Sequence, residues 1–550
     1  MVSDFTMDAN SADAKERKMR RFETRGPVNP QKNYVVSRSE ETADFINRIK
    51  EGRYIVLFAP RQTGKTTFFR RALDMLSTED PNYFPIQLDF QILRNVSPNV
   101  FYERFYQLIR GQIETVLRQR GKNASGELTQ FLERTQLTDS FSMLQFFKQL
   151  ENLLGNPHIV VLIDEFDGIP ETVISDFLYT LRHIYLSNEL RCPYSIGIVG
   201  VKSITQLNYD RSISPFNIQD DFNLPNFTLE QVQELLSQYT EEIGQTFTPE
   251  VIEMLHRQTG GQPFLVNRFA QILTEESDIP KTETIRLEHF LTAHAQMLEE
   301  QNINITHLLT NIRRNPNFKR GLMKIISYER GMKFSLDDEI INELATYGVI
   351  AKGTDGMCEI INPVYQHRIM QAFTPLINGL EHDYFPEDID FEDYLAPTGH
   401  IDLERLLDNF SNFIARVGFR ILQVPDTPQE FVGQDLLYTY LDQFVSIVRG
   451  AMFLEVQTGR GRMDLVIFHN GRKYIVETKI WEGEKRYQAG KQQLRAYLKL
   501  EKALEGYYVV FDHRENPTPL VESETEEDVR VRSYVIPVIQ ERPSSTTSEK

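Results

Sequence analysis

The chain has 550 residues, of which 41% are hydrophobic and 25% are charged, a composition typical of a globular protein with several domains. Its formal net charge of −18 excludes a surface that is basic throughout, so a nucleic acid could meet only a local basic patch. The two cysteines, Cys192 and Cys358, are too few for a disulfide framework or a cysteine metal cluster, which favours a reducing compartment.

The first thirty residues are polar and of mixed charge, and we predict that residues 1–30 form a solvated arm. They lack the apolar core of a signal peptide, and no run in the chain reaches the roughly 18 apolar residues of a membrane span. We therefore expect a cytoplasmic protein without a membrane partner.

From residue 31 to residue 225, runs of apolar, strand-forming residues alternate with stretches of helical periodicity. This alternation is typical of an α/β fold, in which helices cover a mostly parallel sheet. The four runs are YIVLFA (54–59), FPIQLDF (84–90), HIVVLID (158–164) and YSIGIVGV (194–201).

A helical lid is predicted over residues 226–312. It opens with TLEQVQELLSQY, in which Thr228 and Gln231 have the spacing of a capping box. Residues 319–378 have the pattern of two helices followed by a hairpin, the outline of a winged helix. A helical lid packed on the preceding domain fits the same pattern, and winged helices often serve only as spacers.

An acidic, proline-bearing segment, residues 379–400, is predicted to be a linker and marks the clearest domain boundary. The α/β domain predicted after it covers residues 401–540, and residues 541–550 are predicted to be a disordered tail. Its helices are expected at 401–416, 428–449 and 484–505, and its strands at AMFLEVQTG (451–459), RMDLVIFH (462–469), KYIVETKI (473–480) and GYYVVFD (506–512).

The first strand-like run leads into A-P-R-Q-T-G-K-T, residues 59–66, which is one glycine short of the phosphate-binding pattern G-x-x-x-x-G-K-[ST]. Such a loop needs inward-pointing backbone N–H groups, a lysine for the outer phosphates and a hydroxyl for magnesium. Alanine can replace the first glycine if φ is not positive there. The alternative is a chance G-K-T. The residues predicted to contact the nucleotide are Ala59, Arg61, Gln62, Thr63, Gly64, Lys65, Thr66 and Thr67.

A second motif favours a working site. The β-branched run HIVVLID ends in Asp164 and Glu165, which is the Walker B pattern. We predict that Thr66 and Asp164 hold Mg²⁺ and that Glu165 orients the attacking water. Two acids at the end of a buried strand cost desolvation energy unless a cation lies beside them. Residues 31–225 are therefore predicted to be a P-loop ATPase core that uses ATP and Mg²⁺.

Five segments together resemble the AAA-like ATPases of the STAND and archaeal group: GPVNPQKNYVVSRSEE, APRQTGKTT, VVLIDEFD, SPFNIQDDFNLPNFTLEQVQELL and TGGQPFLVNRF. The resemblance covers residues 22–373. It implies that residues 34–38 help to cover the base, and that Gln262 and Pro263 of a G-x-P turn approach the nucleotide from the lid. A homo-oligomer is compatible with the sequence. The candidates for an arginine finger are Arg211 and Arg268.

Another group of charged residues lies near the C-terminus. Asp464 is in one predicted strand, and Glu477 and Lys479 are in the next, across a turn built on HNGRK. Strand alternation puts Glu477 and Lys479 on one face, where Asp464 can approach them in an antiparallel hairpin. Two carboxylates and a lysine can bind Mg²⁺ and orient a water against a phosphodiester. An amphipathic hairpin with a surface salt bridge is the alternative.

The order of elements around these residues resembles the PD-(D/E)XK nucleases, including a helix with Gln493, Leu494 and Tyr497. The resemblance implies that Asp464 and Glu477 ligate a metal and that Lys479 steadies the phosphate or the water. An acid from the first part of the domain should join them. The candidates for it are Glu430 and its rival Asp435, both in a predicted helix, and Glu455 in FLEVQTG is a candidate for a further acid.

Local charge favours a nucleic acid as the partner of this domain, and the family resemblance implies that this nucleic acid is DNA. From residue 455 to residue 502 there are 11 Lys and Arg against 6 Asp and Glu. Solvated helix faces could produce the same count. The predicted phosphate contacts are Arg460, Arg462, Lys485, Arg486, Lys491 and Arg495.

Together these patterns predict an ATP-dependent switch or motor that carries a metal-dependent DNA endonuclease-like domain. The family resemblance alone suggests a setting in prokaryotic defence or mobile-element processing. The alternative is an ATP-gated scaffold or signalling ATPase whose C-terminal domain binds DNA or protein without cleaving it.

Overall fold

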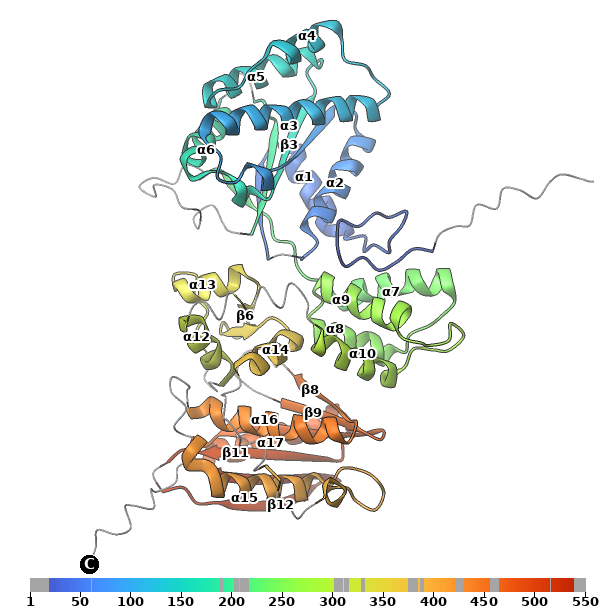
Figure 1. Ribbon diagram of the computed structural model, residues 1–550, viewed down its shortest axis with the longest axis vertical. Coiled ribbons are helices and arrows are strands. Elements are labelled where there is room, and N and C mark those ends of the chain that lie inside the picture. The colour runs from blue at the N-terminus through green and yellow to red at the C-terminus, as the bar shows by residue number, and fades with distance from the viewer. Residues whose placement is uncertain are drawn as a thin grey trace, which may run out of the picture.

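The structure is a computed structural model that describes most of the chain. None of the helices in the described part has both the length and the hydropathy that crossing a membrane requires. An N-terminal core, a middle tier of two mainly helical units and a C-terminal domain follow one another along the longest axis (Figure 1). The described residues are 19–60, 62–187, 191–201, 207, 217–300, 310, 316–327, 332–373, 384–385, 390–421, 429–455, 464–514 and 516–538.

A five-stranded parallel sheet in the order β2-β3-β4-β1-β5 forms the N-terminal core, as the predicted α/β class requires. Apolar residues are buried on both of its faces, with α1 and α2 on one face and α3 to α6 on the other. Only β5 departs from the prediction, because its sequence Gln-Asp-Asp has no apolar pattern. The elements are β1 (Tyr54–Phe58), β2 (Tyr83–Asp89), β3 (His158–Asp164), β4 (Ser195–Gly200), β5 (Gln219–Asp221), α1 (Ser39–Lys50), α2 (Lys65–Glu79), α3 (Pro98–Gln119), α4 (Gly126–Arg134), α5 (Ser140–Leu153) and α6 (Glu171–Leu186).

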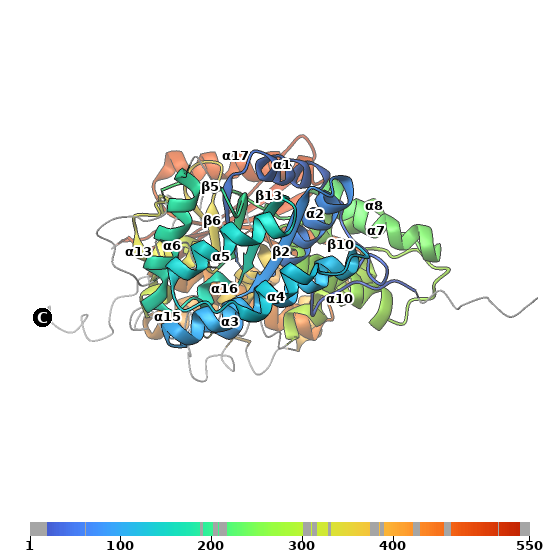
Figure 2. The same cartoon turned by 90° about the horizontal axis from the view of Figure 1, so that it is seen from above.

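Helices α7 to α10 follow the core, and we call them the lid. The hydroxyl of Thr228 accepts a hydrogen bond from the N–H of Gln231, whose side chain accepts one in return, so the predicted capping box is confirmed. Seen from above, α7 and α8 project to one side of the molecule (Figure 2). The elements are α7 (Leu229–Ile243), α8 (Pro249–Thr259), α9 (Pro263–Gln271), a π-helical turn (Ile272–Glu276) and α10 (Leu287–Glu299).

Residues 19–33 pack on the lid, and we call them the N-terminal strap. Phe22 is 2% exposed, and its ring lies 4.8 Å from that of Tyr34 and 5.9 Å from that of Tyr239 in α7. Arg20 donates a hydrogen bond to Glu242 at 2.7 Å. The prediction of a solvated arm is therefore wrong for this segment. Its sequence is mostly polar and charged, so the one buried aromatic residue, Phe22, is not recognised as an anchor. Residues 1–18 lie outside the described part.

A six-stranded mixed sheet in the order β12-β13-β11-β10-β9-β8 forms the C-terminal domain. The side chain of Gln434 in α16 donates to Thr478 at 3.4 Å, which places α16 on the face of Thr478. Helix α17 covers the opposite face, where Gly490 lies against Tyr508. The elements are α15 (Leu403–Ile421), α16 (Gln429–Ile447), β8 (Ala451–Glu455), β9 (Asp464–His469), β10 (Arg472–Ile480), α17 (Glu484–Leu500), β11 (Glu505–Asp512), β12 (Leu520–Glu526) and β13 (Val529–Pro537).

The predicted helices and the first four strands of this domain are present, but the hairpin of β12 and β13 is an addition to the prediction. Its turn at Glu527 and Asp528 has positive φ at both residues, the geometry of a tight two-residue hairpin turn. The alternation of VRVRSYVIP was the signal that favours a strand there.

The unit between the lid and the C-terminal domain has the predicted order of two helices and a hairpin, and a third helix closes it. We call it the spacer unit. Helix α12 packs on α16 and α14 packs on β8, whereas Gly348 lies so close to the N-terminal core that a Cβ there would be 2.4 Å from Pro60 Cγ. The unit therefore touches both ends of the molecule. Its elements are α12 (Pro316–Ser327), α13 (Glu339–Thr346), β6 (Ile350–Lys352), β7 (Cys358–Ile360) and α14 (Pro363–Phe373).

The described part of the predicted acidic linker packs on the C-terminal domain. Tyr384 and Tyr394 are 2% and 1% exposed, and the ring of Phe385 stacks on Tyr440 at 4.9 Å. Asn409 donates to the Tyr384 carbonyl at 2.9 Å. A boundary drawn from acidity overlooks these aromatic anchors, and residues 379–383 and 386–389 lie outside the described part.

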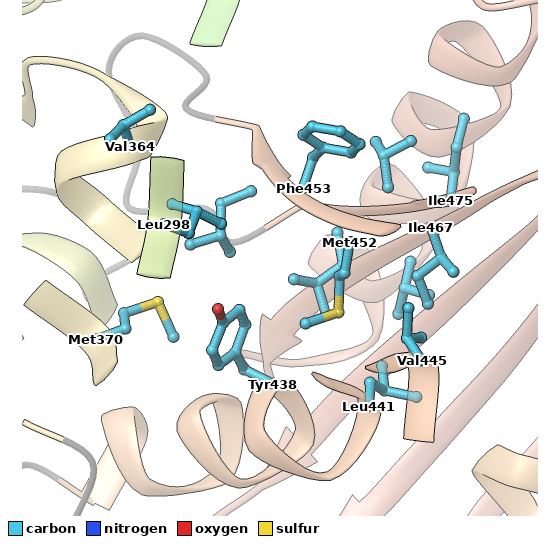
Figure 3. Close-up of a cluster of buried hydrophobic side chains, with 14 of the residues drawn as sticks. Leu298, Val364, Met370, Tyr438, Leu441, Val445, Met452, Phe453, Ile467 and Ile475 are labelled. Carbon is cyan, nitrogen blue, oxygen red and sulfur yellow. The ribbon is translucent and has the colours of Figure 1, made fainter. Parts of the chain in front are cut away.

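One continuous apolar cluster joins the strap, the lid, the spacer unit and the C-terminal domain. Figure 3 shows Leu298 of the lid, Val364 of α14 and Phe453 of β8 within it. The Phe453 ring lies 4.3 Å from that of His294 in α10, and the Tyr438 hydroxyl hydrogen bonds to His367. The N-terminal core has its own two clusters, one on each face of its sheet. Packing therefore divides the chain into the N-terminal core and one larger body.

The shared cluster predicts that damage to β8 spreads to the lid. Phe453→Ala should cost about 3–5 kcal/mol of stability because its ring leaves a cavity between β8 and α10. Hydrogen exchange should then speed up in α10 and α14 as well as in β8 to β10, and stay unchanged in β1 to β4.

The matched control is Phe101→Ala, since Phe101 is equally buried in the N-terminal core, where exchange should rise instead. Faster exchange confined to the C-terminal domain in Phe453→Ala would contradict a shared core.

Candidate functional site

The loop between β1 and α2 has the backbone that a phosphate-binding loop needs. Gly64 caps α2 with φ of 83°, and Gln62 also has positive φ, at 62°. Because Gly64 is in the left-handed region, glycine is the residue that fits there without strain. Ala59 is not among the residues with positive φ, so alanine is accommodated at the first position of the motif. Arg61 lies outside the described residues.

Lys65 is folded back over this loop. Its ammonium group donates to the carbonyl oxygens of Ala59 at 2.7 Å and of Pro60 at 2.6 Å, and the residue is 9% exposed. The Thr63 hydroxyl donates to the same Pro60 carbonyl at 3.0 Å. The charge of Lys65 is thus held at the centre of the loop, where the outer phosphates of a nucleotide would lie.

The two predicted magnesium ligands are in contact. Thr66 Oγ1 donates to Asp164 Oδ2 at 2.8 Å, although 98 residues separate them in sequence. Burial raises the pKa of Asp164, an effect that the hydrogen bonds from Thr66 and from the N–H of Glu165 oppose. A half-buried carboxylate beside a hydroxyl supplies the hard oxygen ligands that Mg²⁺ prefers, so these residues fit that ion.

Glu165 follows directly, with φ of 50°, and lines the cavity beside the loop. A non-glycine residue in the left-handed region is strained, and such strain concentrates at functional sites. Asp89, which the sequence analysis passes over, pairs in register with Asp164 across β2 and β3, and its charge also raises the pKa of Asp164. Asp89 could have been found from the sequence, because it lies near the end of the run FPIQLDF, at the same edge of the sheet as Asp164.

A cavity of about 430 Å³ lies between the loop, the strap and the lid. Pro263 lines it as predicted, whereas Gln262 does not, because its amide bonds to Tyr365 at 3.0 Å and to Asn362 at 3.5 Å in the spacer unit. The turn therefore presents its proline to the cavity and its glutamine to the spacer unit. The residues that line the cavity are Glu23, Thr24, Arg25, Gly26, Pro27, Val28, Gln62, Gly64, Lys65, Thr66, Thr67, Gln91, Glu165, Pro263, Phe264 and Asn267.

A smaller cavity of about 60 Å³ adjoins it. Tyr34 to Arg38 form one of its walls, which is where the resemblance expects the base. Val36, Phe68 and Phe227 make it largely apolar. The guanidinium of Arg38 lies 4.7 Å from the Phe227 ring, and burial lowers the pKa of Arg38 to about 10.

Of the two candidates for an arginine finger, Arg268 is the one that lies among the described residues. Arg268 donates to Glu276 and to Glu300, and its side chain is 14% exposed, so its charge is already paired within the lid. Arg211 lies outside the described residues.

In the C-terminal domain, strand register lines up the predicted acids. Glu455 pairs with Asp464 across β8 and β9, and Asp464 pairs with Glu477 across the predicted antiparallel hairpin of β9 and β10. The Lys479 ammonium group lies 2.9 Å from the Glu477 carboxylate as an ion pair, and both side chains are 4% exposed. A buried ion pair of this kind is costly to desolvate, which argues against the predicted alternative of a surface salt bridge.

Asp435, a predicted acid of this cluster, is not brought to it. Asp435 is 1% exposed in α16, which covers the opposite face of the sheet from Glu477. The side chains of Glu430, Glu455 and Asp464 are not described, and among the side chains that are, no three potential metal ligands of the His, Cys, Asp and Glu types gather.

The predicted basic face of α17 is largely neutralised. Lys491, with a side chain 1% exposed, bonds to Glu522 and Glu524 of β12 at 2.7 Å each. Arg495 pairs with Glu524 and Glu526, and Arg486 pairs with Glu482. The three acids of β12, Glu522, Glu524 and Glu526, therefore offset more than half of the local excess of positive charge, and they lie beyond the sequence window that showed it. Lys485 stays exposed, and Arg460 and Arg462 lie outside the described residues.

Comparisons with known proteins agree with the geometry of the N-terminal part. The sequence pattern of a family described as AAA-like domain matches residues 23–369, more than half of the chain. A second pattern, described as a domain of unknown function (DUF8371), matches residues 403–515. Among curated proteins, no sequence matches this chain.

Solved structures with a similar arrangement include the Walker-type ATPase PABY2304 of Pyrococcus abyssi, with 17% identity over 63% of this chain and 99% of that one and a TM-score of 0.43. The Aeropyrum pernix ORC1 protein in complex with DNA has 14% identity over 61% and 93% of the two chains and a TM-score of 0.32. Thermotoga maritima RuvB has 13% identity over 60% and 94%, also with a TM-score of 0.32. The match to the AAA-like family carries the assignment.

Proposed function

Because the chain belongs to the AAA-like domain family, we propose that it binds ATP with Mg²⁺ between the phosphate loop and the lid, and that it hydrolyses this ATP. The observation that carries the proposal is the hydrogen bond of Thr66 to Asp164, which unites the two halves of the site. Thr66 and Asp164 would hold the ion, whose chemistry is to neutralise charge on the phosphates.

The remaining residues of the loop have separate tasks. The N–H groups at the start of α2 point toward the phosphates, and Lys65 exchanges its two loop carbonyls for phosphate oxygens. Glu165, at the edge of the same cavity, orients the water that attacks the outer phosphate.

The position of this site gives ATP control over the rest of the molecule. One wall of the cavity is the N-terminal core, and the other walls are the strap and the lid, which share the apolar cluster of the larger body. The spacer unit also touches the loop, through Gly348 and Pro60. A nucleotide that draws these walls together would move the larger body, and the C-terminal domain with it, as one unit.

For the C-terminal domain we propose metal-dependent cleavage of a nucleic-acid phosphodiester. The supporting observation is the register of Glu455, Asp464 and Glu477 across three neighbouring strands. Lys479 forms an ion pair with Glu477. Asp464 and Glu477 would hold a divalent ion, which supplies charge neutralisation at the phosphate. Lys479, whose ammonium group lies 2.9 Å from Glu477, would hold that carboxylate in place.

The competing proposal is an ATP-gated scaffold that binds nucleic acid or protein without cutting it. The pairing of Lys491 and Arg495 with β12 favours the protein-binding form of this alternative, because it removes charge that a nucleic acid would use. A cleavage assay on single- and double-stranded DNA and RNA, with Mg²⁺ or Mn²⁺, decides between the two.

ATP turnover tests the first proposal. Lys65→Ala should abolish it, because the loop loses the cation that reaches the outer phosphates. Glu165→Gln should still bind ATP but hydrolyse it about 10²-fold more slowly or worse, since the metal ligands remain. Lys50→Ala, an exposed change at the end of α1, is the control and should match the parent. Parental turnover in both site variants would refute the assignment.

Nuclease activity tests the second proposal. Cleavage should need a divalent ion and should be lost in Asp464→Ala and in Lys479→Ala, and the double variant should be hardly worse than either, because both residues serve one arrangement. Lys499→Ala, an exposed change near the end of α17, is the control. Thermal melting must show that each variant is folded, because Lys479→Ala leaves Glu477 without its partner.

Binding of nucleic acid without cleavage under any of these metal conditions would support the scaffold. Cleavage that survives both substitutions would place the activity elsewhere.

A further inference from the structure

Asn267 of α9 lies where the two cavities of the nucleotide site meet. It lines both of them, together with Val28, Gly64, Thr67 and Pro263. The residue is only 7% exposed. A buried polar side chain at the junction of two cavities calls for a hydrogen-bonding role, since buried polar atoms are rarely left unpaired.

The amide of Asn267 is half satisfied. Its Nδ2 donates to the carbonyl of Pro263 at 2.8 Å, which fixes the orientation of the amide. Its Oδ1 has no hydrogen-bond partner in the described part of the chain. The side chain therefore holds a fixed, unused acceptor beside the two cavities.

The character of the two cavities decides which part of a nucleotide is nearest. The larger one contains Lys65 and Thr66, where phosphates bind, and the smaller one is lined mainly by apolar residues, which suit the edge of a base. The sugar joins phosphate to base, so it occupies the junction. Resting on the proposed nucleotide site, we infer that Asn267 Oδ1 accepts a hydrogen bond from a ribose hydroxyl and makes the site selective for ribonucleotides.

Equilibrium binding of four nucleotides tests this inference: ATP, 2′-deoxy-ATP, 3′-deoxy-ATP and ITP. The parent protein should bind one of the deoxy analogues about tenfold more weakly than ATP, because that analogue leaves the buried carbonyl unpaired. In Asn267→Ala this ratio should fall to about one, while the ratio of ATP to ITP stays as in the parent.

Asn226→Ala is the matched control. This asparagine also donates its amide to a lid carbonyl, that of Gly260 at 3.1 Å, but it lines neither cavity, so the deoxy ratio should persist. If Asn267→Ala does not fold, the affinities of the parent protein for ATP and the two deoxy analogues test the inference by themselves.

Equal affinity of the parent for ATP and both deoxy analogues would overturn the inference, and so would a deoxy ratio that survives in Asn267→Ala. A change in the ATP to ITP ratio instead would assign the carbonyl to the amino group of the base. Failure of the proposed function would look different, because the parent would then show no ATP binding that depends on Lys65.

Discussion

The continuous apolar cluster that runs from the strap to the C-terminal sheet is the constraint on which the rest of the structure depends. Close-packed cores do not deform gradually, so the units that share this one move together. The N-terminal core does not share it, and the nucleotide cavity lies along the division. Chemistry at the phosphate loop therefore acts at the boundary between two bodies.

Hydrogen bonds cross that boundary beside the loop, where Gln231 of α7 donates to Glu41 of α1 and the Val28 N–H donates to Thr67 of α2, each at 3.1 Å. Apolar contacts cross it at the loop itself. Pro263 lies against Gly64, and Gly348 lies against Pro60. Neither contact includes a charge, so neither opposes a change of position as a buried ion pair would. Within the larger body, by contrast, Arg257 of the lid bonds to Glu501 and to Tyr497 of α17 at 3.1 Å, which adds polar links to the shared core.

The same physical device appears in both candidate sites. A carboxylate on a strand has a neighbouring partner: the Thr66 hydroxyl donates to the half-buried Asp164, and Lys479 forms an ion pair with the buried Glu477. These pairs are shielded from water before any ligand binds, so each carboxylate interacts more strongly with a charged ligand that binds beside it. The acidic strand β12 has a different part, since it neutralises α17 from outside the predicted cluster and accounts for much of the local charge balance.

Sequence reasoning succeeded where an apolar run ends in a chemical motif. Thr66 and Asp164 could be placed together because both follow buried parallel strands, whose carboxyl ends meet at one edge. Asp464 and Glu477 could be paired because a short turn joins their strands.

It failed where position depends on contacts between distant segments. Phe22 in the strap, the turning of Gln262 toward Tyr365 and the pairing of Lys491 with β12 are of this kind. A charge count in a local window cannot detect a strand that packs back from 31 residues later, as Lys491 and Glu522 show. The place of Asn267 likewise depends on two cavities that form only when three segments meet.

We expect ATP to move the larger body as one unit relative to the N-terminal core. Spin labels at Glu127→Cys in α4, Glu241→Cys in α7 and Leu500→Cys in α17, introduced in pairs, can measure it, because all three positions are exposed and the native Cys192 and Cys358 are buried. In the Glu165→Gln background, adding ATP should change the distance from residue 127 to residue 500 and leave the distance from residue 241 to residue 500 unchanged. If ATP does not change the first distance, or if it changes the second, the larger body does not move as one unit relative to the N-terminal core.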